Sequence, residues 1–511
     1  MVYSDLSFAY KRLRDTLGEE RVSTENLEKL VYSHDFAPLP KQAAIQFKLK
    51  PDIMTLPRST QEVVRILKLG RELEFPVVPR GGGTSLHGGS VPNVGGILLS
   101  TNLMNRVEDV DENRLSITAQ AGAIWKDVMD AVSDAGFSLP VAPIFYRSST
   151  VGGFLSNGGV GIGSYKFGPA SHWVRSLEVA LPEGRTLDTG EKDFDIGSQN
   201  YNLTNLFLGA EGTLGVITEA TLKVVPAPER VSISAYSFES IRAMVYALSQ
   251  LARLPITPNH ISFVDGSHLI LQTALLKQLP DVPAMVLLAF EGDKKGVVAE
   301  GKVADDVLLS SGGRKEGDEV GKILWEDRYE PYSARRISGG LVVAEGLVPL
   351  SRLEEAVELT TRVVKRLKAE AAFHGFLVDR SSAYLAPYFL TNERFLRGQL
   401  GISFVERYHR ILTDLDGHPL GLGMPATYNL QTMYGHITAY MRGVKQALDP
   451  ESTVNRGKLL GTMGKNPPLI PADMIPLELP RGLMRRGLRV LGALRRLMPA
   501  DRYVSKLRRK R

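Results

Sequence analysis

The stretch RGGGTSLHGGS, from Arg80 to Ser90, has five glycines in eleven residues and follows the apolar segment FPVV. Glycines at this density let a backbone adopt positive φ angles, or approach another group more closely than a Cβ would permit. The apolar segment that leads into the stretch predicts a strand that ends in a glycine-rich loop. The fold therefore depends on what this loop approaches.

Two more glycine clusters follow: STVGGFLSNGGVGIGSYKFG at 149–168 and FLGAEGTLGVITEATLKVVP at 207–226. None of the three matches the dinucleotide pattern G-x-G-x-x-G or the phosphate-loop pattern G-x-x-x-x-G-K-[ST]. Any one cluster could mark a tight turn, but three clusters that each follow a strand-like segment favour a shared role. Exposed backbone N–H groups in such loops form anion-binding concavities, which suit a pyrophosphate.

Length and composition bound the class of protein. A chain of 511 residues predicts two or three domains, and 43% hydrophobic with 23% charged residues indicates a globular protein. The absence of cysteine excludes disulfides and thiolate-bound iron–sulfur clusters within this chain. No stretch approaches the ~20 apolar residues of a membrane span, and the N-terminus lacks the apolar core of a signal peptide, so we expect a cytoplasmic protein.

The positive charge is concentrated at the C-terminus. From Pro480 to Arg511 there are 12 Lys or Arg residues and one acid, a balance of +11, so the overall +6 leaves about −5 for the rest. This distribution disfavours nucleic-acid binding by the folded body. On a helix the segment would place apolar residues such as Leu488 and Leu491 opposite arginines such as Arg485. That pattern suits an anionic membrane surface, on the inner face of the cell membrane, or a partner protein.

Segments 51–90, 142–168 and 207–226 resemble, in motif, order and spacing, the FAD-binding domain of the vanillyl-alcohol oxidase superfamily. The similarity is greatest to the branch that holds the glycolate oxidase flavin subunit and D-lactate dehydrogenases. It resumes at FEGD (290–293), GLVPLSRLEEAVE (346–358) and KQALDPESTVNRGKLL (445–460).

The resemblance implies an α+β protein: a two-subdomain FAD-binding domain, of the type also called PCMH-type, followed by an α+β cap with an antiparallel sheet. The expected divisions are 1–226 for the FAD-binding domain (core about 47–226), 227–443 for the cap, 444–474 for a return to the first domain and 475–511 for the basic tail.

The resemblance also implies which residues contact FAD. In the first loop, where the backbone would wrap the pyrophosphate and a bulkier residue at 81–83 would collide with it, these are Pro79, Arg80, Gly81, Gly82, Gly83, Thr84, Ser85, Gly88, Gly89 and Ser90. In the second they are Pro143, Ser148 (or Ser149), Thr150, Gly152, Gly153, Asn157, Gly158 and Gly161. The third loop and the C-terminal motif add Gly209, Glu211, Gly212, Gly215, Ile217 and Asn455.

The flavin is expected to be bound without a covalent link. Some members of the superfamily attach it through a histidine in the first loop, and the matching position here is Thr84. His87 lies three residues further on and is expected to be a loop or substrate-side residue.

The metal-binding motifs of close relatives are incomplete here. Relatives carry GHxGDGNxH and GEHG, whereas this chain reads FHGFLVDRSSAYLAPYF (373–389) and DLDGHPLGLG (414–423). His374 matches a first ligand with no second histidine after it, and Gly417 replaces the ligand glutamate before His418. No metal site is therefore expected.

The implied chemistry needs a base for a hydroxyl proton and a cation for a carboxylate. His418 is the expected base, with a turn residue as the structural alternative and His374 as the next candidate. Arg328 matches a family arginine and suits a carboxylate; the competitors are Arg335 and Arg336, or a solvated basic face. Tyr384 and Tyr388 are expected to bind substrate, unless they are core aromatics.

The resulting hypothesis is an FAD-dependent dehydrogenase of a small 2-hydroxy acid, such as D-lactate or glycolate. Its electrons would pass to a quinone or to an iron–sulfur partner, since the chain lacks cysteine. One alternative is an enzyme like the alkyl-dihydroxyacetone-phosphate synthases, which use FAD without net oxidation. Another is a non-catalytic flavin subunit of a larger dehydrogenase.

Overall fold

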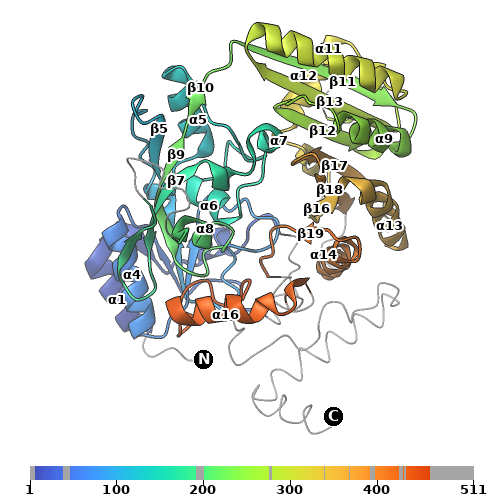
Figure 1. The fold of residues 1–511 in the computed structure, drawn as a ribbon. Coiled ribbons are helices and arrows are strands. Elements are labelled where there is room, and N and C mark those ends of the chain that lie inside the picture. Colours follow the sequence, from blue (N-terminus) through green and yellow to red (C-terminus); the bar gives the residue numbers. More distant parts are fainter. Residues whose placement is uncertain are drawn as a thin grey trace.

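The computed structural model describes residues 6–37, 47–190, 201–275, 279–338, 340–367, 369–391, 397–424, 430 and 433–460. In this part of the chain two small sheets with their helices form a first unit, and one large antiparallel sheet with its helices forms a second (Figure 1).

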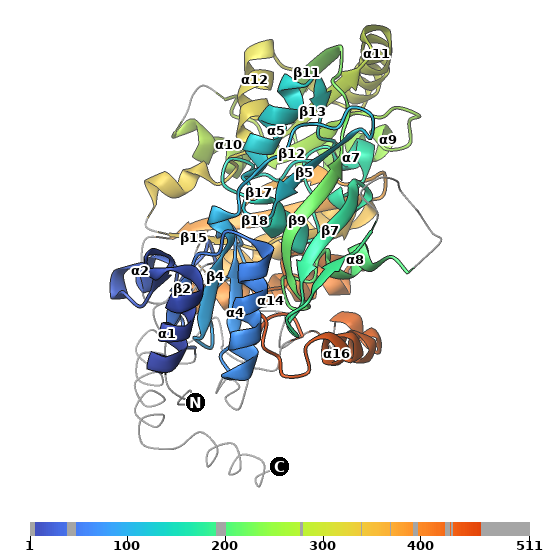
Figure 2. The same cartoon turned by 90° about the vertical axis from the view of Figure 1, so that its left-hand side faces the viewer.

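The first small sheet holds the strand that leads into the Arg80–Ser90 loop. Its order is β1 (Val22–Ser23), β2 (Ile53–Thr55), β4 (Ile97–Ser100) and β3 (Val77–Arg80), with β2 and β3 parallel to β4. The helices α1 (Leu6–Leu17) and α4 (Thr60–Glu72) pack beside it, with the short α2 (Asn26–Val31) nearby (Figure 2). The Ser59 side chain accepts a hydrogen bond from the Glu62 backbone N–H and caps α4.

The second small sheet carries the other two glycine clusters. Its strands are β5 (Ser116–Gln120), β9 (Val216–Lys223), β7 (Val174–Ala180) and β8 (Thr186–Asp188), all antiparallel. Beside it lie α5 (Trp125–Asp134), α6 (Val151–Ser156), α7 (Ser164–Phe167), α8 (Leu203–Phe207) and the strand pair β6 (Phe137–Ser138) and β10 (Val225–Pro226).

The large sheet is antiparallel throughout, as the resemblance predicted. Its order is β14-β11-β13-β12-β17-β18-β16-β19, and β15 also pairs with β18. The strands are β11 (Arg230–Phe238), β12 (His260–Asp265), β13 (Ala284–Gly292), β14 (Arg314–Lys315), β15 (Gly340–Val343), β16 (Gly346–Pro349), β17 (Ala372–Leu377), β18 (Ser382–Thr391) and β19 (His418–Pro419). The helices are α9 (Ile241–Leu251), α10 (Gly266–Thr273), α11 (Lys294–Ser310), α12 (Asp318–Asp327), α13 (Leu353–Arg366) and α14 (Arg397–Asp414).

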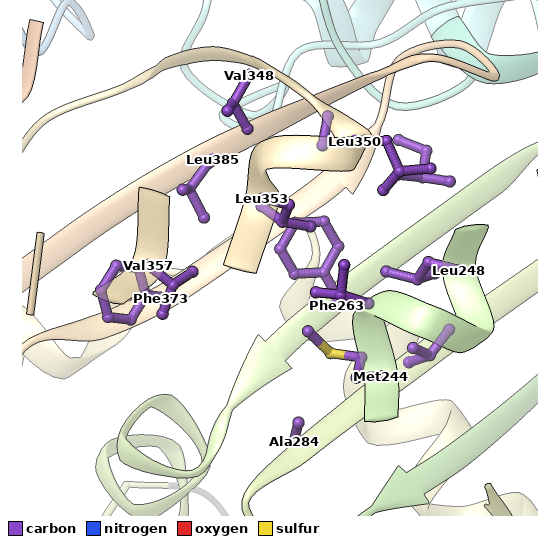
Figure 3. Packing of buried hydrophobic residues seen from close by; sticks show 14 of the residues in the cluster. Met244, Leu248, Phe263, Ala284, Val348, Leu350, Leu353, Val357, Phe373 and Leu385 are labelled. Atoms are coloured by element: carbon purple, nitrogen blue, oxygen red, sulfur yellow. The ribbon is translucent and has the colours of Figure 1, made fainter. Parts of the chain in front are cut away.

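Both faces of this sheet are covered where it meets the first unit. On one face, Leu385 and Phe373 pack against residues such as Met244, Leu248 and Leu353 of the helices (Figure 3). The other face carries the alternate residues of the same strands, which lie against the loops of the first unit. This double cover explains why β18 is buried almost continuously rather than at every second residue.

The chain returns to the first unit at its described C-terminal end, where α16 (Ile437–Leu448) lies below the first unit in Figure 1. The Lys445 ammonium donates to Asp449 and to the backbone carbonyls of Thr213 and Val454. The Asn455 backbone N–H donates to the Val77 carbonyl at 2.8 Å. These contacts hold residues 445–460 against the strand that leads into the glycine loop.

Candidate functional site

The three glycine clusters meet around one open cavity, with about 710 Å³ of empty space including its mouth. Most of the expected cofactor residues line it: Pro79, Arg80, Gly81, Gly82, Gly83, Thr84, Ser85, Gly89, Ser90, Thr150, Gly152, Gly153, Asn157, Glu211, Gly212, Gly215, Ile217 and Asn455. Thr101 and Ala121 also line it and were missed, because they lie outside the glycine clusters. Ser156 and Val216 line it too; they lie inside the clusters but were not among the expected contacts. Gly88, Pro143, Ser148, Gly158, Gly161 and Gly209 do not line it.

The protein itself leaves no room for a side chain at Gly81 and Gly82. A Cβ added to Gly82 would collide with the Ser148 carbonyl oxygen, and one added to Gly81 would collide with the Thr150 hydroxyl. The expected collision with a pyrophosphate stays a prediction. These two glycines therefore allow two loops to pack directly against each other, with the cavity beside them.

The first loop presents unpaired donors to this cavity. Within the described residues, the backbone N–H groups of Gly82, Gly83, Thr84 and Ser85 donate to no protein acceptor. The Asn455 amide donates to the carbonyls of Gly89 and Glu211, while its own oxygen is buried without a partner. Successive N–H groups of this kind bind anions, so the cavity fits the pyrophosphate of FAD. The free oxygen of the Asn455 side chain could accept a hydrogen bond from a donor group of FAD.

Two buried ionisable side chains, Lys458 and Glu211, connect the C-terminal segments to the loops around this cavity. Burial lowers the pKa of Lys458 to about 7, against the attraction of Asp35 and Glu211, and its ammonium donates to the Val91 carbonyl at 2.8 Å. The Glu211 carboxylate accepts a hydrogen bond from the Gly423 backbone N–H at 2.7 Å. The third glycine cluster is thereby joined to the chain that follows β19.

A second, smaller cavity lies against the inner face of the large sheet. Its polar lining consists of His260 and Ser262 on β12, His268 on α10, His374 on β17, and Asp327 and Arg328 at the end of α12. The first unit contributes Ile162 of the second glycine cluster, and Ile144 shortly before that cluster, to the lining. Two of the expected catalytic residues, Arg328 and His374, thus share one cavity.

Arg328 is set apart from its two competitors by burial. Its guanidinium stacks over the rings of Trp325 and Tyr329, at 3.3 and 4.0 Å from the ring centres, and burial lowers its pKa to about 10. It forms no ion pair with a carboxylate among the described residues. Arg335 and Arg336 are exposed and line neither cavity. A half-buried guanidinium without a carboxylate partner in the described chain is suited to pair with the carboxylate of a ligand.

His374 stands at one end of a buried hydrogen-bonded chain. His374 Nε2 lies 2.8 Å from the Tyr332 hydroxyl, which is a hydrogen-bonding neighbour of the Tyr384 hydroxyl. Tyr384 donates to Glu345 Oε2 at 2.5 Å, and His87 Nε2 lies 3.0 Å from Glu345 Oε1. Burial raises the pKa of Glu345, but the hydrogen bonds from His87 and Tyr384 outweigh it and hold that pKa below its usual value.

The tautomer of His374 depends on the direction of its hydrogen bond to Tyr332. The ionised Glu345 only accepts hydrogen bonds, so Tyr384 donates to it, whereas either His374 Nε2 or the Tyr332 hydroxyl can be the donor of the bond between them. Burial, assisted by His268, lowers the pKa of His374 well below 6.5, so the ring is neutral at pH 7. In the tautomer with the proton on Nε2, the Nδ1 atom is a basic nitrogen able to accept a proton.

A second chain explains where Tyr388 lies. Its hydroxyl is 2.9 Å from His268 Nδ1, and His268 Nε2 is 3.0 Å from Asp327 Oδ2. Tyr388 is therefore a buried partner of His268, and burial raises its pKa well above 10. Sequence reasoning missed His268, Tyr332 and Glu345, because the residues of these chains are brought together only by the pairing of distant strands.

His418 lies elsewhere. It is exposed on β19, its Nδ1 is 2.7 Å from the carbonyl of the adjacent Pro419, and its ring centre is 5.2 Å from that of Tyr434. It lines neither cavity, so its assignment as the base stays a prediction that no contact supports. His87, in contrast, is buried and bonded to Glu345. It lines neither cavity, so its expected place as a loop or substrate-side residue stays a prediction.

Three expectations concern absent features or residues outside the described part of the chain. Among the described residues, no three His, Cys, Asp or Glu side chains are grouped as a metal site would require, and the absence of a metal stays a prediction. No helix within the described ranges is long and apolar enough to cross a membrane. The basic tail at 475–511 lies outside the described residues.

Comparisons with known proteins agree with this geometry. Residues 51–190 match the family of the FAD binding domain, and residues 227–459 match the C-terminal domain of FAD linked oxidases. The chain is 30% identical to the glycolate oxidase subunit GlcD of Bacillus subtilis, over 88% of this chain and 96% of that protein. It is 28% identical to the probable mitochondrial D-lactate dehydrogenase of Danio rerio, over 88% of this chain and 90% of the relative.

Solved structures share the fold. An alkyldihydroxyacetonephosphate synthase superposes with a TM-score of 0.71 at 22% identity, covering 89% of this chain and 85% of the other. The 4-ethylphenol oxidase of Gulosibacter chungangensis superposes with a TM-score of 0.75 at 18% identity, covering 89% and 98%. The chain thus belongs to the FAD-linked oxidases of the glycolate oxidase and D-lactate dehydrogenase type, and it is an FAD-binding oxidoreductase.

Proposed function

We propose that this protein oxidises a 2-hydroxy acid in the second cavity, which residues of β12 and β17 line. The observation that carries the proposal is the half-buried Arg328, which has no carboxylate partner in the described chain and lines the same cavity as the neutral His374. A guanidinium pairs well with a carboxylate, and a neutral imidazole accepts a proton near pH 7.

In this proposal each side chain has one task. Arg328 binds the substrate carboxylate, and His374 Nδ1 takes the proton of the 2-hydroxyl group. Tyr332 and Tyr384, anchored on Glu345, hold the His374 ring in the tautomer that leaves Nδ1 basic. When bound, FAD supplies the acceptor for the hydride that leaves the substrate carbon.

The test is flavin reduction without oxygen. Mixing the protein with D- and L-2-hydroxy acids should bleach the flavin absorbance with one enantiomer of one class. Arg328→Met should raise the substrate concentration that gives half-maximal reduction by at least tenfold, because the carboxylate loses a charged partner. Arg336→Met, at an exposed arginine close by in the sequence, should change it less than twofold. Bleaching that is unchanged by Arg328→Met would contradict the proposal.

The electron acceptor is proposed to be a quinone or an iron–sulfur partner. A relative from Saccharomyces cerevisiae, 27% identical, has a name that specifies cytochrome, so acceptors other than oxygen occur among similar proteins. Reoxidation of the reduced protein by a soluble quinone faster than by air would support this assignment.

A second candidate function is that of an alkyl-dihydroxyacetone-phosphate synthase, favoured by the structural neighbour of that name and by the apolar lining of the second cavity. Such an enzyme catalyses no net oxidation, so its flavin would stay oxidised at the end of the reaction with every hydroxy acid. A non-catalytic flavin subunit would likewise give no bleaching, and would show no turnover with an alkylated phosphate substrate either.

FAD is expected to leave the protein on acid precipitation. Thr84 stands where some members of the superfamily have a flavin-bearing histidine, and its hydroxyl lies 3.2 Å from that of Ser149. The yellow colour should therefore remain in the supernatant after precipitation of the chain. Flavin that stays with the pellet would reveal a covalent link, for which His87 would be the residue to examine.

The basic tail is proposed to attach the protein to an anionic membrane surface. Truncation after Met474 should leave the FAD content unchanged and abolish sedimentation with vesicles that contain phosphatidylserine. Binding of the full-length chain should weaken as salt rises, since screening reduces charge attraction. A full-length protein that does not sediment with such vesicles at low salt would instead indicate a protein partner for the tail.

A further inference from the structure

We infer that the acid bound at Arg328 carries a second, uncharged hydroxyl group, as a 2,3-dihydroxy acid does, and that His260 and Ser262 bind this group. The inference deepens the proposed function, on which it rests for the 2-hydroxyl group and its oxidation. It concerns the face of β12 that lines the second cavity.

The strand β12 turns alternate side chains to opposite sides of the large sheet. Ile261 and Phe263 pack in the helix-covered core. The residues between and beside them, His260, Ser262 and Val264, therefore face the other side, and they line the second cavity. The strand thus presents one imidazole ring and one hydroxyl group to the cavity.

Neither polar side chain has a hydrogen-bond partner within the described residues. The His260 ring lies against the rings of Trp325 and Phe376, with ring centres 6.4 and 5.5 Å apart, and the residue is 2% exposed. Protein atoms enclose Asp327 Oδ1, whereas the His260 nitrogens and the Ser262 hydroxyl are not enclosed in this way. A polar group in such surroundings costs free energy until water or a ligand bonds to it.

The two groups lie along the length of the proposed substrate site. Arg328 stacks on the tryptophan that neighbours His260, so His260 marks the end of the site that binds the carboxylate. Val264 pairs with His374 across the strands and marks the other end. Ser262 lies between them, about 6.7 Å along the strand from His260 and from Val264. A hydroxyl group on the third carbon of an acid in this site is therefore close to β12.

The charges around the cavity favour a hydroxyl group over a second carboxylate. Burial, assisted by Arg328, lowers the pKa of His260 to about 3, so its ring is neutral at pH 7. Within the described lining, Arg328 is the one Lys or Arg residue, and Asp327 beside it is an acid. A second carboxylate would lose its water without gaining a cation, and a methyl group would bond to neither polar side chain. A hydroxyl group donates and accepts, and so fits both.

The experiment measures the binding of acids that lack the 2-hydroxyl group. The FAD-loaded protein is titrated with propanoate, 3-hydroxypropanoate and malonate, by calorimetry and by the fluorescence of Trp325, which contacts both Arg328 and His260. 3-Hydroxypropanoate should bind about tenfold more tightly than propanoate, the upper range for one net hydrogen bond. Malonate should bind more weakly than 3-hydroxypropanoate. Equal affinities for propanoate and 3-hydroxypropanoate, or tightest binding of malonate, would overturn the inference.

Matched variants locate the hydroxyl group. Ser262→Ala and His260→Phe should each reduce the tenfold difference to about threefold or less, because each removes one partner, while propanoate binding is kept. Ser232→Ala makes the same change as Ser262→Ala on β11, at a residue that lines neither cavity, and should retain the difference. If Ser262→Ala and His260→Phe retain it too, the hydroxyl group is not bound on β12 and the inference fails. If these variants do not fold, the three acids on the wild type decide.

Flavin reduction separates the two proposals. A higher kcat/KM for glycerate, which is 2,3-dihydroxypropanoate, than for lactate supports both. Tighter binding of 3-hydroxypropanoate without reduction by any hydroxy acid leaves the site for the second hydroxyl group standing and contradicts the proposed oxidation. Reduction by lactate together with equal binding of propanoate and 3-hydroxypropanoate keeps the proposed function and overturns the inference.

Discussion

Replacing Gly82 by valine is expected to give a protein without FAD. The added Cβ would collide with the Ser148 carbonyl oxygen, and a backbone oxygen cannot turn away as a flexible side chain can. The first loop must then move away from the second. Because Gly82, Gly83, Thr84 and Ser85 present their N–H groups to the cavity, this movement disturbs the donors that fit a pyrophosphate.

The measurement is the ratio of flavin absorbance to protein, with circular dichroism to show that the chain is folded. Gly301→Val is the matched control, since a Cβ at Gly301 would meet nothing within 4 Å, and it should retain its FAD. A Gly82→Val protein with a normal flavin content would show that the loops separate without loss of the cofactor.

The cofactor cavity was largely predictable from the sequence, and the catalytic residues were not. Glycine clusters mark places where backbones must approach closely, so the residues near 82, 152 and 212 pointed to one site without any knowledge of the fold. What the sequence did not reveal was the object approached: for Gly82 it is the Ser148 carbonyl. A glycine cluster in the sequence indicates that the backbone lies close to another group, but only the three-dimensional structure shows which group that is.

The chain of side chains behind His374 has no local signal. Glu345, His374 and Tyr384 are separated in sequence and come close because β16 and β17 both pair with β18. Tyr332 comes from the segment between α12 and β15. The antiparallel class of this sheet was predicted from the family resemblance, but strand registers were not. His418 shows the converse: it stands beside a motif-like sequence, yet β19 holds it at an exposed edge of the sheet.

Replacing His374 by glutamine is expected to slow flavin reduction by the substrate about 10²–10⁴-fold, the usual contribution of a positioned acid–base group. The glutamine amide can still donate to Tyr332, so the buried chain and the fold should persist, but no basic nitrogen remains. FAD content should be unchanged, because His374 does not line the cofactor cavity. Stopped-flow absorbance of the flavin measures the rate.

The pH profile separates His374 from an exposed base. Burial lowers the pKa of His374 well below 6.5, so the ring is already neutral at pH 6, and raising the pH further removes no proton from it. The wild-type rate of reduction should therefore show no inflection near the ~6.5 of an ordinary imidazole. His418→Gln is the matched substitution at the residue that the sequence favoured, and we expect it to change the rate less than twofold. Flavin reduction that is slow in His418→Gln and normal in His374→Gln would show that the base is the histidine on β19. The substrate must then bind outside the second cavity.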